Sequence, residues 1–422
     1  MRKHKGIKKI FVAMSGGVDS SVAAALLKNQ GYEVIGIHMR CYNVDGCATQ
    51  DAEDARRAAE VLDIPFYVFD FEQEYKERVV NYMVEGYRAG ITPNPDVMCN
   101  KEIKFGMFLR KALEMGAPAC RQAGIYVATG HYVRLKSYSE PISFLRNPRS
   151  RESMVRRLPA EQPAVERRGQ ASPALAGRSG LREKIRRALF VAKDKNKDQS
   201  YFLWTLTQKQ LERCLFPIGD YLKPEVRAMA RKFGLPNADK KDSQGICFLG
   251  KVTLADFLKD YIPERRGAVL NTAGKTLGEH SGAYFYTIGQ RHGLGISNGR
   301  PAYIAEKDVK TNTLVLAEGG DNPALYRKEI QLTEINFINP KTISLISAKG
   351  GQARLPASGG NSGITVYARV RYRQPLARAT LKLINSKTHQ LIFEEPQKFV
   401  APGQSAVFYS EDGEMLGGGI IS

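Results

Sequence analysis

Long apolar runs are missing from this sequence. Charged residues or glycine interrupt each run well short of the roughly 18 residues that a membrane-spanning helix needs. A charged-then-apolar opening stretch with a small-residue cleavage site, the pattern of a secretion leader, is also absent. We therefore expect a cytoplasmic protein without a membrane partner.

Cysteine is scarce as well, with six in 422 residues, and histidine is equally rare. So few cysteines in so long a chain cannot form the disulfide framework of a small secreted protein, and we expect thiols. No C-x-x-C pair occurs and the histidines are scattered, so the sequence predicts neither a zinc nor an iron–sulfur site, and no other metal site built by the protein. Each cysteine must then be judged by its neighbours: Cys41, Cys47, Cys99, Cys120, Cys214 and Cys247.

Acidic residues are outnumbered, with 43 Asp and Glu against 63 Lys and Arg, which leaves a formal net charge of +20. The excess is spread over all regions and favours a polyanionic partner such as a nucleic acid. A charge that serves only solubility remains an alternative. The chain is too long for one ordinary core, so two or three domains are expected.

The amino-terminal part alternates short apolar strands with helical patterns. Strands are expected at 10–14, 34–39, 66–69 and 125–129, and helices at 20–30, 49–62, 73–89 and 101–115. This alternation predicts an α/β fold in which helices cover both faces of a parallel sheet. Ligands bind to such sheets at the carboxyl ends of the strands.

Three domains are predicted along the chain: the parallel-sheet domain over 1–207, a small, largely helical linking domain over 208–266, and a β-barrel-like domain over 267–422. Two inserts interrupt them. Residues 137–190 are basic and rich in Pro, Ser and Gly, which predicts a largely disordered segment, and residues 348–363 are Gly/Ser-rich and predict a flexible loop. The basic insert could be a nucleic-acid arm or an inert surface loop.

The strongest local signal is AMSGGVDSS, residues 13–21, between the first expected strand and helix. Glycines let backbone N–H groups approach a phosphate, serines add hydroxyl donors, and the helix presents its positive end. The Walker pattern G-x-x-x-x-G-K-[ST] is absent, so transfer of a γ-phosphate is not indicated. The stretch predicts a pyrophosphate-binding turn, and an ordinary tight turn is the alternative.

This stretch resembles the SGGxDS loop of the PP-loop ATP pyrophosphatases, which cleave ATP between the α and β phosphates and leave AMP on a substrate oxygen. The resemblance implies that ATP binds here, accompanied by Mg²⁺. The expected ATP-binding residues of the loop are Ala13, Met14, Ser15, Gly16, Gly17, Val18, Asp19 and Ser20. Asp19 could help to hold the metal ion or could cap the helix, and both roles stay open.

Four further segments are similar to the signatures of the tRNA-specific 2-thiouridylase (MnmA) family: GITPNPDVMCNKEIKFG (90–106), ATGHY (128–132), KNKDQSYF (195–202) and SQGICFL (243–249). The resemblance covers the whole chain except the two inserts. It implies ATP-dependent 2-thiolation of the wobble uridine of tRNA. Adenylation makes the uridine 2-oxygen a good leaving group, and sulfur from a cysteine persulfide replaces it. The implied partners are tRNA and a sulfur donor relay, a protein that carries a persulfide.

By this resemblance, Cys99 is the catalytic nucleophile and Cys247 the persulfide carrier, with a disulfide between them as a by-product. The residues themselves support a reactive Cys99, because it is expected at the start of a helix and is followed by Lys101 and Lys104. Helix N-terminal N–H groups and ammonium charges both lower the pKa of a thiol. A buried structural cysteine is the alternative.

The resemblance also assigns binding residues. Asn94, Pro95 and Asp96 would form the pocket for the flipped-out target base, Met39 and Gly130 would line the adenosine site, and Lys197, Asp198, Gln199, Arg371 and Tyr372 would contact tRNA. Asp96 is in addition a candidate general acid or base beside the uracil, with a turn residue as its alternative. For Arg371 and Tyr372, in a basic strand expected to end at Arg373, a solvated strand face is the alternative.

Other functions remain to be weighed. An amidating or lysidine-forming ATP pyrophosphatase would use ammonia or lysine as its nucleophile and would not need Cys99 and Cys247 in these surroundings. An iron–sulfur-dependent thiolase would need a C-x-x-C pair, which is absent. A non-catalytic RNA-binding protein with a decayed nucleotide loop is disfavoured because SGGVDSS is intact.

Overall fold

The computed structural model describes residues 8–44, 48–116, 124–141, 183–241, 249–250, 252–295, 300–340, 342 and 363–422. Residues 136–188 form a unit of their own, separate from the unit made by the rest of the chain. No described helix is both long and apolar enough to cross a membrane.

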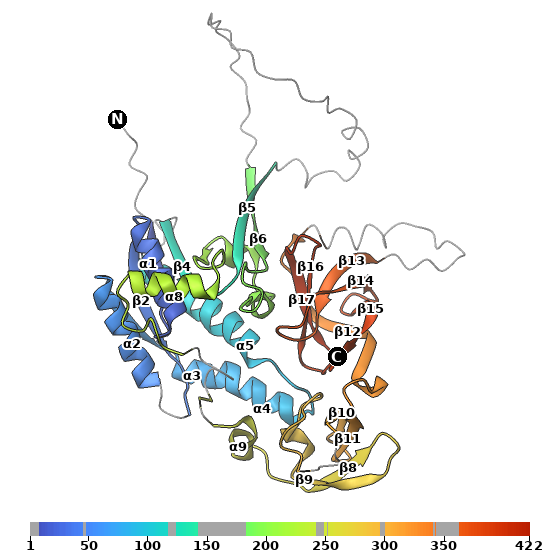
Figure 1. Cartoon of the computed structure of the whole chain (residues 1–422). Helices are drawn as coiled ribbons and strands as arrows, with labels where there is room; N and C mark the ends of the chain where they lie inside the picture. The colour runs from blue at the N-terminus through green and yellow to red at the C-terminus, as the bar shows by residue number, and fades with distance from the viewer. Residues whose placement is uncertain are drawn as a thin grey trace, which may run out of the picture. The chain divides into compact units, whose positions relative to one another are not determined.

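A five-stranded parallel sheet forms the amino-terminal part of the fold (Figure 1). Its strands are β1 (Lys9–Ala13), β2 (Glu33–Arg40), β3 (Phe66–Asp70), β4 (Ile125–Thr129) and β7 (Cys214–Leu215), paired in the order β3-β2-β1-β4-β7. The expected parallel sheet is confirmed. Strand β1 has β2 on one side and β4 on the other, so the order reverses there. The switch point, where ligands bind in such sheets, lies at the carboxyl ends of β1 and β4.

Alternation of side chains along β1 places a hydrophobic cluster on each face of the sheet. Ile10 and Val12 contact one cluster, whereas Phe11 and Ala13 contact the other. Successive side chains of a strand point to opposite faces, and all four are at most 8% exposed. A continuous apolar run is what a strand buried on both faces requires.

Helices cover both faces. The cluster of Ile10 and Val12 includes side chains of α1 (Val18–Asn29), α2 (Ala48–Val61) and α8 (Lys223–Lys232). The other cluster includes α3 (Glu72–Tyr75), the π-helical η1 (Lys76–Val80), α4 (Asn81–Arg88), α5 (Pro95–Met98), the π-helical η2 (Cys99–Met107) and α6 (Phe108–Gly116). The expected helices are therefore present, although π-helical turns interrupt two of them.

The expected linking domain contributes directly to the sheet. Residues 208–232 supply α7 (Gln208–Leu211), the short strand β7 that pairs with β4, and α8, which packs against α1. The short helices η6 (Ser200–Leu203) and α9 (Leu254–Lys259) lie before and after this stretch. Pairing of only two residues in β7 gives no periodic signal, which explains why the sequence suggested helix throughout.

Two strands occupy the ends of the expected basic insert. β5 (Arg134–Pro141) and β6 (Glu183–Phe190) form a two-stranded sheet. The Arg186 guanidinium lies over the Tyr138 ring at 4.7 Å from its centroid. Residues 142–182, most of that insert, lie outside the described residues, as does 348–362 of the second expected loop.

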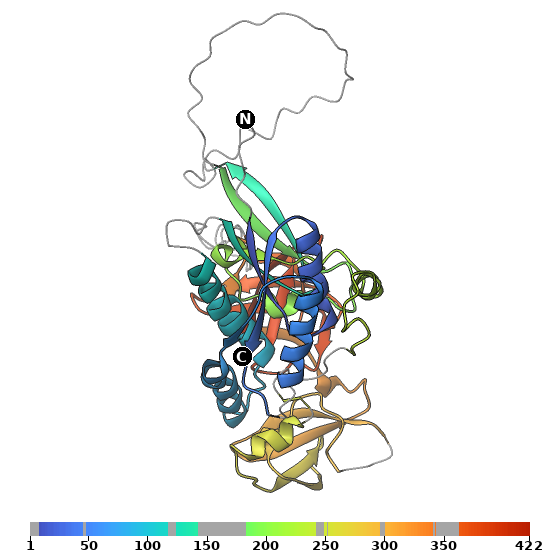
Figure 2. The same cartoon turned by 90° about the vertical axis from the view of Figure 1, so that its left-hand side faces the viewer.

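The described residues of the carboxyl-terminal part are mainly β-strands, which form two sheets. One is four-stranded, in the order β10-β11-β8-β9, and is coloured yellow to orange in Figure 2. Its strands are β8 (Gly267–Asn271), β9 (Thr276–His280), β10 (Ala302–Asp308) and β11 (Thr313–Glu318), with the short helices η7 (Ala283–Phe285) and η8 (Pro323–Leu325) nearby in sequence.

The second is a closed barrel around its own hydrophobic cluster, which includes Leu332, Leu381 and Phe408. The strands are β12 (Tyr326–Phe337), β13 (Ile364–Arg369), β14 (Ala377–Leu383), β15 (His389–Lys398), β16 (Ser405–Tyr409) and β17 (Met415–Ile421), closed in the order β12-β15-β14-β13-β16-β17. The predicted fold class, an α/β domain followed by a β-barrel, is confirmed.

Candidate functional site

The glycine-rich turn at the end of β1 is braced by its own serines. The Ser15 N–H donates to Ser20 Oγ over 3.1 Å, and the hydroxyls of Ser20 and Ser21 each donate to the Gly17 carbonyl over 3.1 Å. Gly17 is the N-cap of α1, and within the described chain no side chain caps it. The first N–H groups of a helix have no partner inside it, so the turn presents donors and a partial positive charge to an anion.

Gly16 needs to be glycine for two reasons. Its φ of +76° lies in the left-handed region, and a Cβ built on it would lie 2.3 Å from the Asp51 carbonyl oxygen of α2. Asn237 holds the turn from the other side, because its Nδ2 donates to the Gly16 carbonyl over 2.9 Å and to Ser21 Oγ over 3.0 Å. The loop is therefore clamped between α2 and the segment after α8.

Asp19, in the first turn of α1, is bonded to two residues from distant parts of the sequence. The Lys223 ammonium lies 2.8 Å from each of its carboxylate oxygens, and the Tyr132 hydroxyl donates to Oδ1 over 2.8 Å. These two partners occupy the carboxylate in the structure, and a role of Asp19 at a metal ion stays a prediction.

The chain after β4 lies directly against this turn. A Cβ on Gly130 would come within 2.6 Å of the Ser20 backbone nitrogen, so only glycine permits the approach. Met39, at the carboxyl end of β2, is half-buried against the core. The residues expected around ATP therefore gather at the carboxyl ends of β1, β2 and β4, as ligand positions do in sheets of this kind.

The helix that contains Cys99 begins earlier than expected. Its N-cap is Asn94, whose side chain accepts the Val97 N–H over 3.2 Å, and Pro95 is the first helical residue. Cys99 lies in the second turn, and its N–H donates to carbonyls of Pro95 and Asp96. The expectation that Cys99 starts the helix is wrong. Because the dipole effect falls off within the first turn, it contributes less to this thiol than to Asp96.

Cys99 is 5% exposed and belongs to the hydrophobic cluster on this face of the sheet. Asp96, three residues earlier, lies on the same side of the helix, and Asn100 Nδ2 donates to the Asp96 carbonyl over 2.9 Å. Burial raises the pKa of the Asp96 carboxyl, an effect that the Lys104 ammonium opposes. A carboxylate with a raised pKa is a stronger proton acceptor than an ordinary one.

His131 faces this second group of residues. Its ring lies 6.0 Å from that of Phe105, and its Nδ1 is 2.8 Å from Thr129 Oγ1. Burial, assisted by the Lys104 charge, lowers the pKa of His131 well below its ordinary value, so the ring is neutral. Consecutive residues after β4 therefore contact both groups of expected site residues: Gly130 contacts the glycine-rich turn, and His131 contacts the helix of Cys99.

The barrel braces the loop that leads into Asn94. Thr92 N–H donates to the Pro402 carbonyl over 2.7 Å, and Gln404 Nε2 donates to the carbonyls of Thr92 and Pro93 over 2.9 and 3.2 Å. Sequence positions more than 300 apart thus meet at the expected target-base pocket. The barrel fixes the backbone from which Asn94, Pro95 and Asp96 project.

The expected tRNA contacts near η6 differ in exposure. Lys197 is half-exposed, but Asp198 is 3% exposed and forms a buried ion pair with Arg369 of the barrel. Gln199 pairs with the Tyr132 backbone in both directions, over 2.9 and 3.0 Å. Of these three residues, the geometry leaves Lys197 as the one whose side chain suits a phosphate contact.

Arg371 and Tyr372 were expected in a strand that ends at Arg373. Strand β13 ends at Arg369, so both residues lie in the turn that follows it. Arg373 adopts a φ of +67°, which breaks the strand geometry. Arg371 Nε donates to the Phe399 carbonyl over 2.8 Å and Nη2 bonds to the Ile288 carbonyl. The Tyr372 ring packs 4.5 Å from that of Phe202. Both side chains are half-buried, so part of each remains available to a ligand.

Cys247, the expected persulfide carrier, lies outside the described residues. The described residues before and after Cys247 contact the sheet domain. Lys240 bonds to Asp51 over 2.7 Å and to Asp54, both on α2, and Leu249 is buried in the cluster that also includes Cys99.

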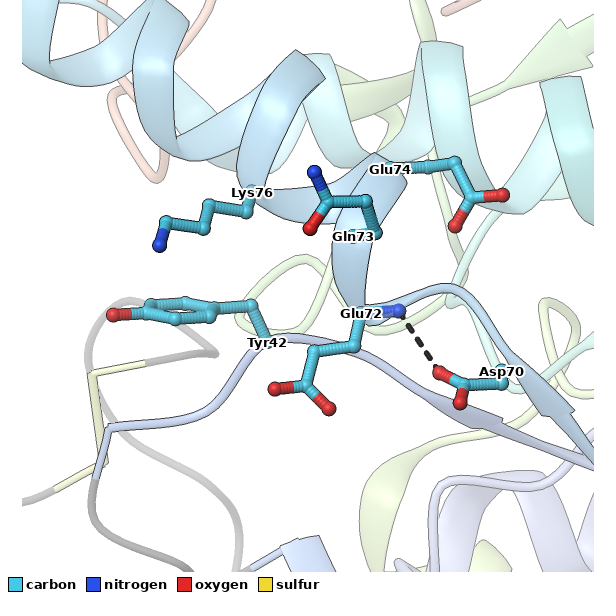
Figure 3. A pocket seen from close by; sticks show the side chains of 6 residues that line it. All are labelled: Tyr42, Asp70, Glu72, Gln73, Glu74 and Lys76. Atoms are coloured by element: carbon cyan, nitrogen blue, oxygen red, sulfur yellow. Dashed lines mark hydrogen bonds between the residues drawn. The ribbon is translucent and has the colours of Figure 1, made fainter.

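A pocket of about 370 Å³ opens at the carboxyl ends of β2 and β3 (Figure 3). It is lined by Tyr42, Asp70, Glu72, Gln73, Glu74 and Lys76. The Glu72 N–H donates to Asp70 Oδ1 over 3.1 Å, and the Lys76 ammonium lies 5.8 Å from the Tyr42 ring centroid. Its three carboxylates make it unsuited to phosphate, and it contains none of the expected site residues.

Three residues that bind the phosphate turn were missed by the sequence analysis: Tyr132, Lys223 and Asn237. Tyr132 belongs to the ATGHY segment, so its position was noticed without a role. Lys223 and Asn237 reach the loop from more than 200 positions away in the sequence. Only a knowledge of the packing of α8 on α1 could have identified them.

The sheet, its glycine-rich turn and the helix after it define an α/β protein of the nucleotide-binding type, extended by two β domains. Family models agree with this class. A tRNA methyl transferase HUP domain matches residues 8–154 and 175–251, a tRNA methyl transferase PRC-barrel domain 255–318, and an aminomethyltransferase beta-barrel domain 327–421.

Curated relatives extend over the full length. The chain is 39% identical over 427 residues to the tRNA-specific 2-thiouridylase MnmA of Bacillus pumilus, covering 100% of this chain and 96% of the relative. It is 39% identical over 426 residues to MnmA 1 of Geobacillus kaustophilus (98% and 95%) and 38% identical over 424 residues to MnmA of Listeria monocytogenes (98% and 94%). The chain belongs to the tRNA-specific 2-thiouridylase (MnmA) family.

A solved structure of NMN synthetase from Francisella tularensis is similar to a smaller part of the chain. It has a TM-score of 0.21 and 19% identity, and covers 30% of this chain and 45% of that one.

Proposed function

We propose that this enzyme catalyses ATP-dependent 2-thiolation of the wobble uridine of tRNA. The uridine 2-oxygen is first adenylated, with release of pyrophosphate, and sulfur from a cysteine persulfide then replaces it as AMP leaves. The relatives at 38–39% identity are named tRNA-specific 2-thiouridylases, which supports the substrate and the atom transferred.

ATP is assigned to the turn at the carboxyl end of β1. The N–H groups at the start of α1 would bind its phosphates, Met39 and Gly130 would line the adenosine, and Mg²⁺ would enter with the nucleotide as counter-ion to the phosphates. The turn fits this role because Gly16 permits close backbone approach and its neighbours already brace it. Among the described residues, no cluster of three or more His, Cys, Asp or Glu side chains forms a metal site.

Sulfur transfer is assigned to Cys99 and Cys247. Cys247 receives sulfur as a persulfide from a donor protein, and Cys99 releases the sulfur or resolves the persulfide, with a disulfide between the two as by-product. A persulfide has a polarisable terminal sulfur that can attack the activated carbon without a metal ion. Support for this role comes from the position of Cys99 three residues after Asp96, on the same side of one helix.

Asp96 is assigned as the acid or base beside the uracil. Adenylation of the 2-oxygen removes the proton of uracil N3, and a carboxylate whose pKa is raised by burial is a better acceptor for that proton than an ordinary one. Asn94 and Pro95 fix the helix start from which Asp96 projects. Lys197, Arg371 and Tyr372 are assigned to tRNA contact, with Asp198 and Gln199 placing that surface. We assign the reaction to the cytoplasm.

One observation supports this proposal above the others. The four residues Thr129–Tyr132 contact both halves of the site: Gly130 and Tyr132 lie against the phosphate turn, and His131 lies against the helix of Cys99 and Asp96. A base that enters beside this segment would meet ATP on one side and the cysteine helix on the other.

Purified protein, tRNA, ATP and a persulfide-carrying sulfur donor provide the test, with 2-thiouridine measured by mass spectrometry of tRNA nucleosides. Cys99→Ser and Cys247→Ser should each abolish the product. Cys214→Ser is the matched control, because Cys214 is also buried and its thiol donates to the Gln210 carbonyl, which a hydroxyl can do as well. Undiminished product from either of the first two variants would refute the role of that cysteine.

A further inference from the structure

Lys223, at the first position of α8, has no role in the reaction as proposed so far. Its ammonium lies 2.8 Å from both carboxylate oxygens of Asp19, and its side chain is 10% exposed. Its backbone N–H donates to Asp194 Oδ2 over 2.9 Å, which fixes the start of α8. An ammonium group is thus held at the turn that we assign to the phosphates of ATP.

The negative charge of Asp19 at this turn requires a nearby cation if phosphates are to bind there. Asp19 lies in the first turn of α1, where the phosphates are expected, and a carboxylate there repels them. The bonded Lys223 ammonium cancels that repulsion. The Lys223 side chain is 10% exposed and that of Asp19 is 30% exposed, so solvent screens the pair less than it would on an open surface.

Tyr132 allows the ammonium to change partners. Its hydroxyl donates to Asp19 Oδ1, and its ring lies 6.0 Å from Lys223 Nζ. If Lys223 turns towards a phosphate, Asp19 keeps the Tyr132 hydrogen bond and the ammonium remains beside the ring. The flexible four-carbon stem of lysine permits such a shift without movement of α8.

We propose that Lys223 is a phosphate-binding residue of the nucleotide site, which contacts the β-phosphate of ATP and stabilises pyrophosphate as it leaves. This inference rests on the proposed cleavage of ATP between its α and β phosphates. In that step a bond forms between the uracil 2-oxygen and the α-phosphorus. The bond from the α-phosphorus to the bridging oxygen breaks, and its electron pair stays on pyrophosphate. The N3 proton passes to Asp96.

The growing charge lies on the pyrophosphate, between the N-terminus of α1 and the Lys223 ammonium. A fixed cation that meets charge developing in the transition state lowers the barrier more than one that meets only the ground state. AMP has no β-phosphate, so Lys223 should matter more for ATP and pyrophosphate than for AMP.

The test compares the binding of ATP and of AMP to the full-length protein by isothermal titration calorimetry without tRNA. Lys223→Met should weaken ATP binding on the order of ten-fold or more, the effect of losing one charge-assisted hydrogen bond. AMP binding should weaken less than ATP binding, because AMP loses no β-phosphate contact and meets only the repulsion of the uncompensated Asp19 carboxylate. Equal loss for both nucleotides, as a structural role predicts, or loss for neither would overturn the proposal.

Lys193→Met is the matched control. Lys193 pairs with Glu225 of the same helix α8 at 3.2 Å, and both side chains are exposed, so its removal should change neither affinity. If Lys223→Met does not fold, Lys223→Gln replaces it. Glutamine still donates to Asp19 without a charge, and the same selective loss of ATP binding is expected. The native protein could also fail to form 2-thiouridine while Lys223→Met still loses affinity for ATP selectively. That result would contradict the proposed function and leave the phosphate contact of Lys223 standing.

Discussion

The Tyr132 hydroxyl donates a 2.8 Å hydrogen bond to the Asp19 carboxylate, although the two residues lie 113 positions apart in the sequence. Tyr132 follows β4 and Asp19 follows β1, so the bond spans the switch point of the sheet. His131, the neighbour of Tyr132, packs on Phe105 of the Cys99 helix. The glycine-rich turn and the helix of Cys99 are therefore contacted by adjacent residues of one short segment.

The clamped phosphate turn leads to a prediction for Gly16. Gly16→Ala should weaken ATP binding more than ten-fold, because its Cβ would displace the Asp51 backbone and the turn with it. Binding of ATP is measured by calorimetry. Gly31→Ala is the control, because Gly31 also has a positive φ of +81° but has nothing within 4 Å of an added Cβ. It should cost about 1 kcal/mol of stability and leave ATP binding intact. Equal ATP affinity in the two variants would contradict the clamp.

The buried pair of Asp198 and Arg369 predicts a stability effect. Asp198→Asn should lower the free energy of unfolding by about 3–5 kcal/mol, since it leaves the Arg369 charge without its counter-ion. Thermal or denaturant unfolding gives the measurement. Arg378→Met, which breaks an exposed pair with Glu394, should have little effect. The ion pair is not structural if the two variants unfold alike.

Lys197 provides a test of the tRNA surface. Lys197→Ala should weaken tRNA binding and reduce the slope of log affinity against log salt by about 1, as expected when one phosphate contact is lost. Filter binding over a range of salt concentrations measures the slope. Lys310→Ala, on an exposed turn of the four-stranded sheet, should leave the slope unchanged. An unaltered slope in Lys197→Ala would remove this residue from the tRNA surface.

Lys307 predicts how stability depends on pH. Its ammonium donates to the Tyr286 carbonyl over 2.9 Å, and burial lowers its pKa from 10.5 to about 8. Between these two values the unfolded chain binds more protons than the folded protein, so this residue makes stability rise with pH over that window. Lys307→Met should remove that contribution. The melting temperature of the native protein, relative to the variant, should then rise between about pH 8 and pH 10. A constant or falling difference would contradict the assignment.

The sequence revealed the sheet because its signals are local. The buried strand at 10–14, the glycine-rich turn and the helix after it each follow from a few neighbouring residues. The helix start at Pro95 is also predictable from local sequence, since Asn at the N-cap followed by Pro at the first helical position is a recognised helix start. Strand β7 could not be predicted, because two paired residues are too few to show the alternation of a strand.

Contacts between distant segments could not be predicted in the same way. Asp198 belongs to a segment that resembles a tRNA-binding signature, yet its carboxylate is buried against Arg369, 171 positions further on. Lys223 is one of 63 basic residues, and nothing near it in the sequence distinguishes it from the others. Their partners follow from how the barrel and α8 pack on the sheet domain.

Oxygen tracing tests the central claim most directly. An anticodon stem-loop with ¹⁸O at the 2-position of the target uridine is incubated with the protein, ATP and the sulfur donor, and the nucleotide products are weighed by mass spectrometry. If the 2-oxygen is adenylated and then replaced by sulfur, AMP should contain one ¹⁸O for each 2-thiouridine formed. Unlabelled AMP in the presence of 2-thiouridine, or ADP in place of AMP, would contradict the account.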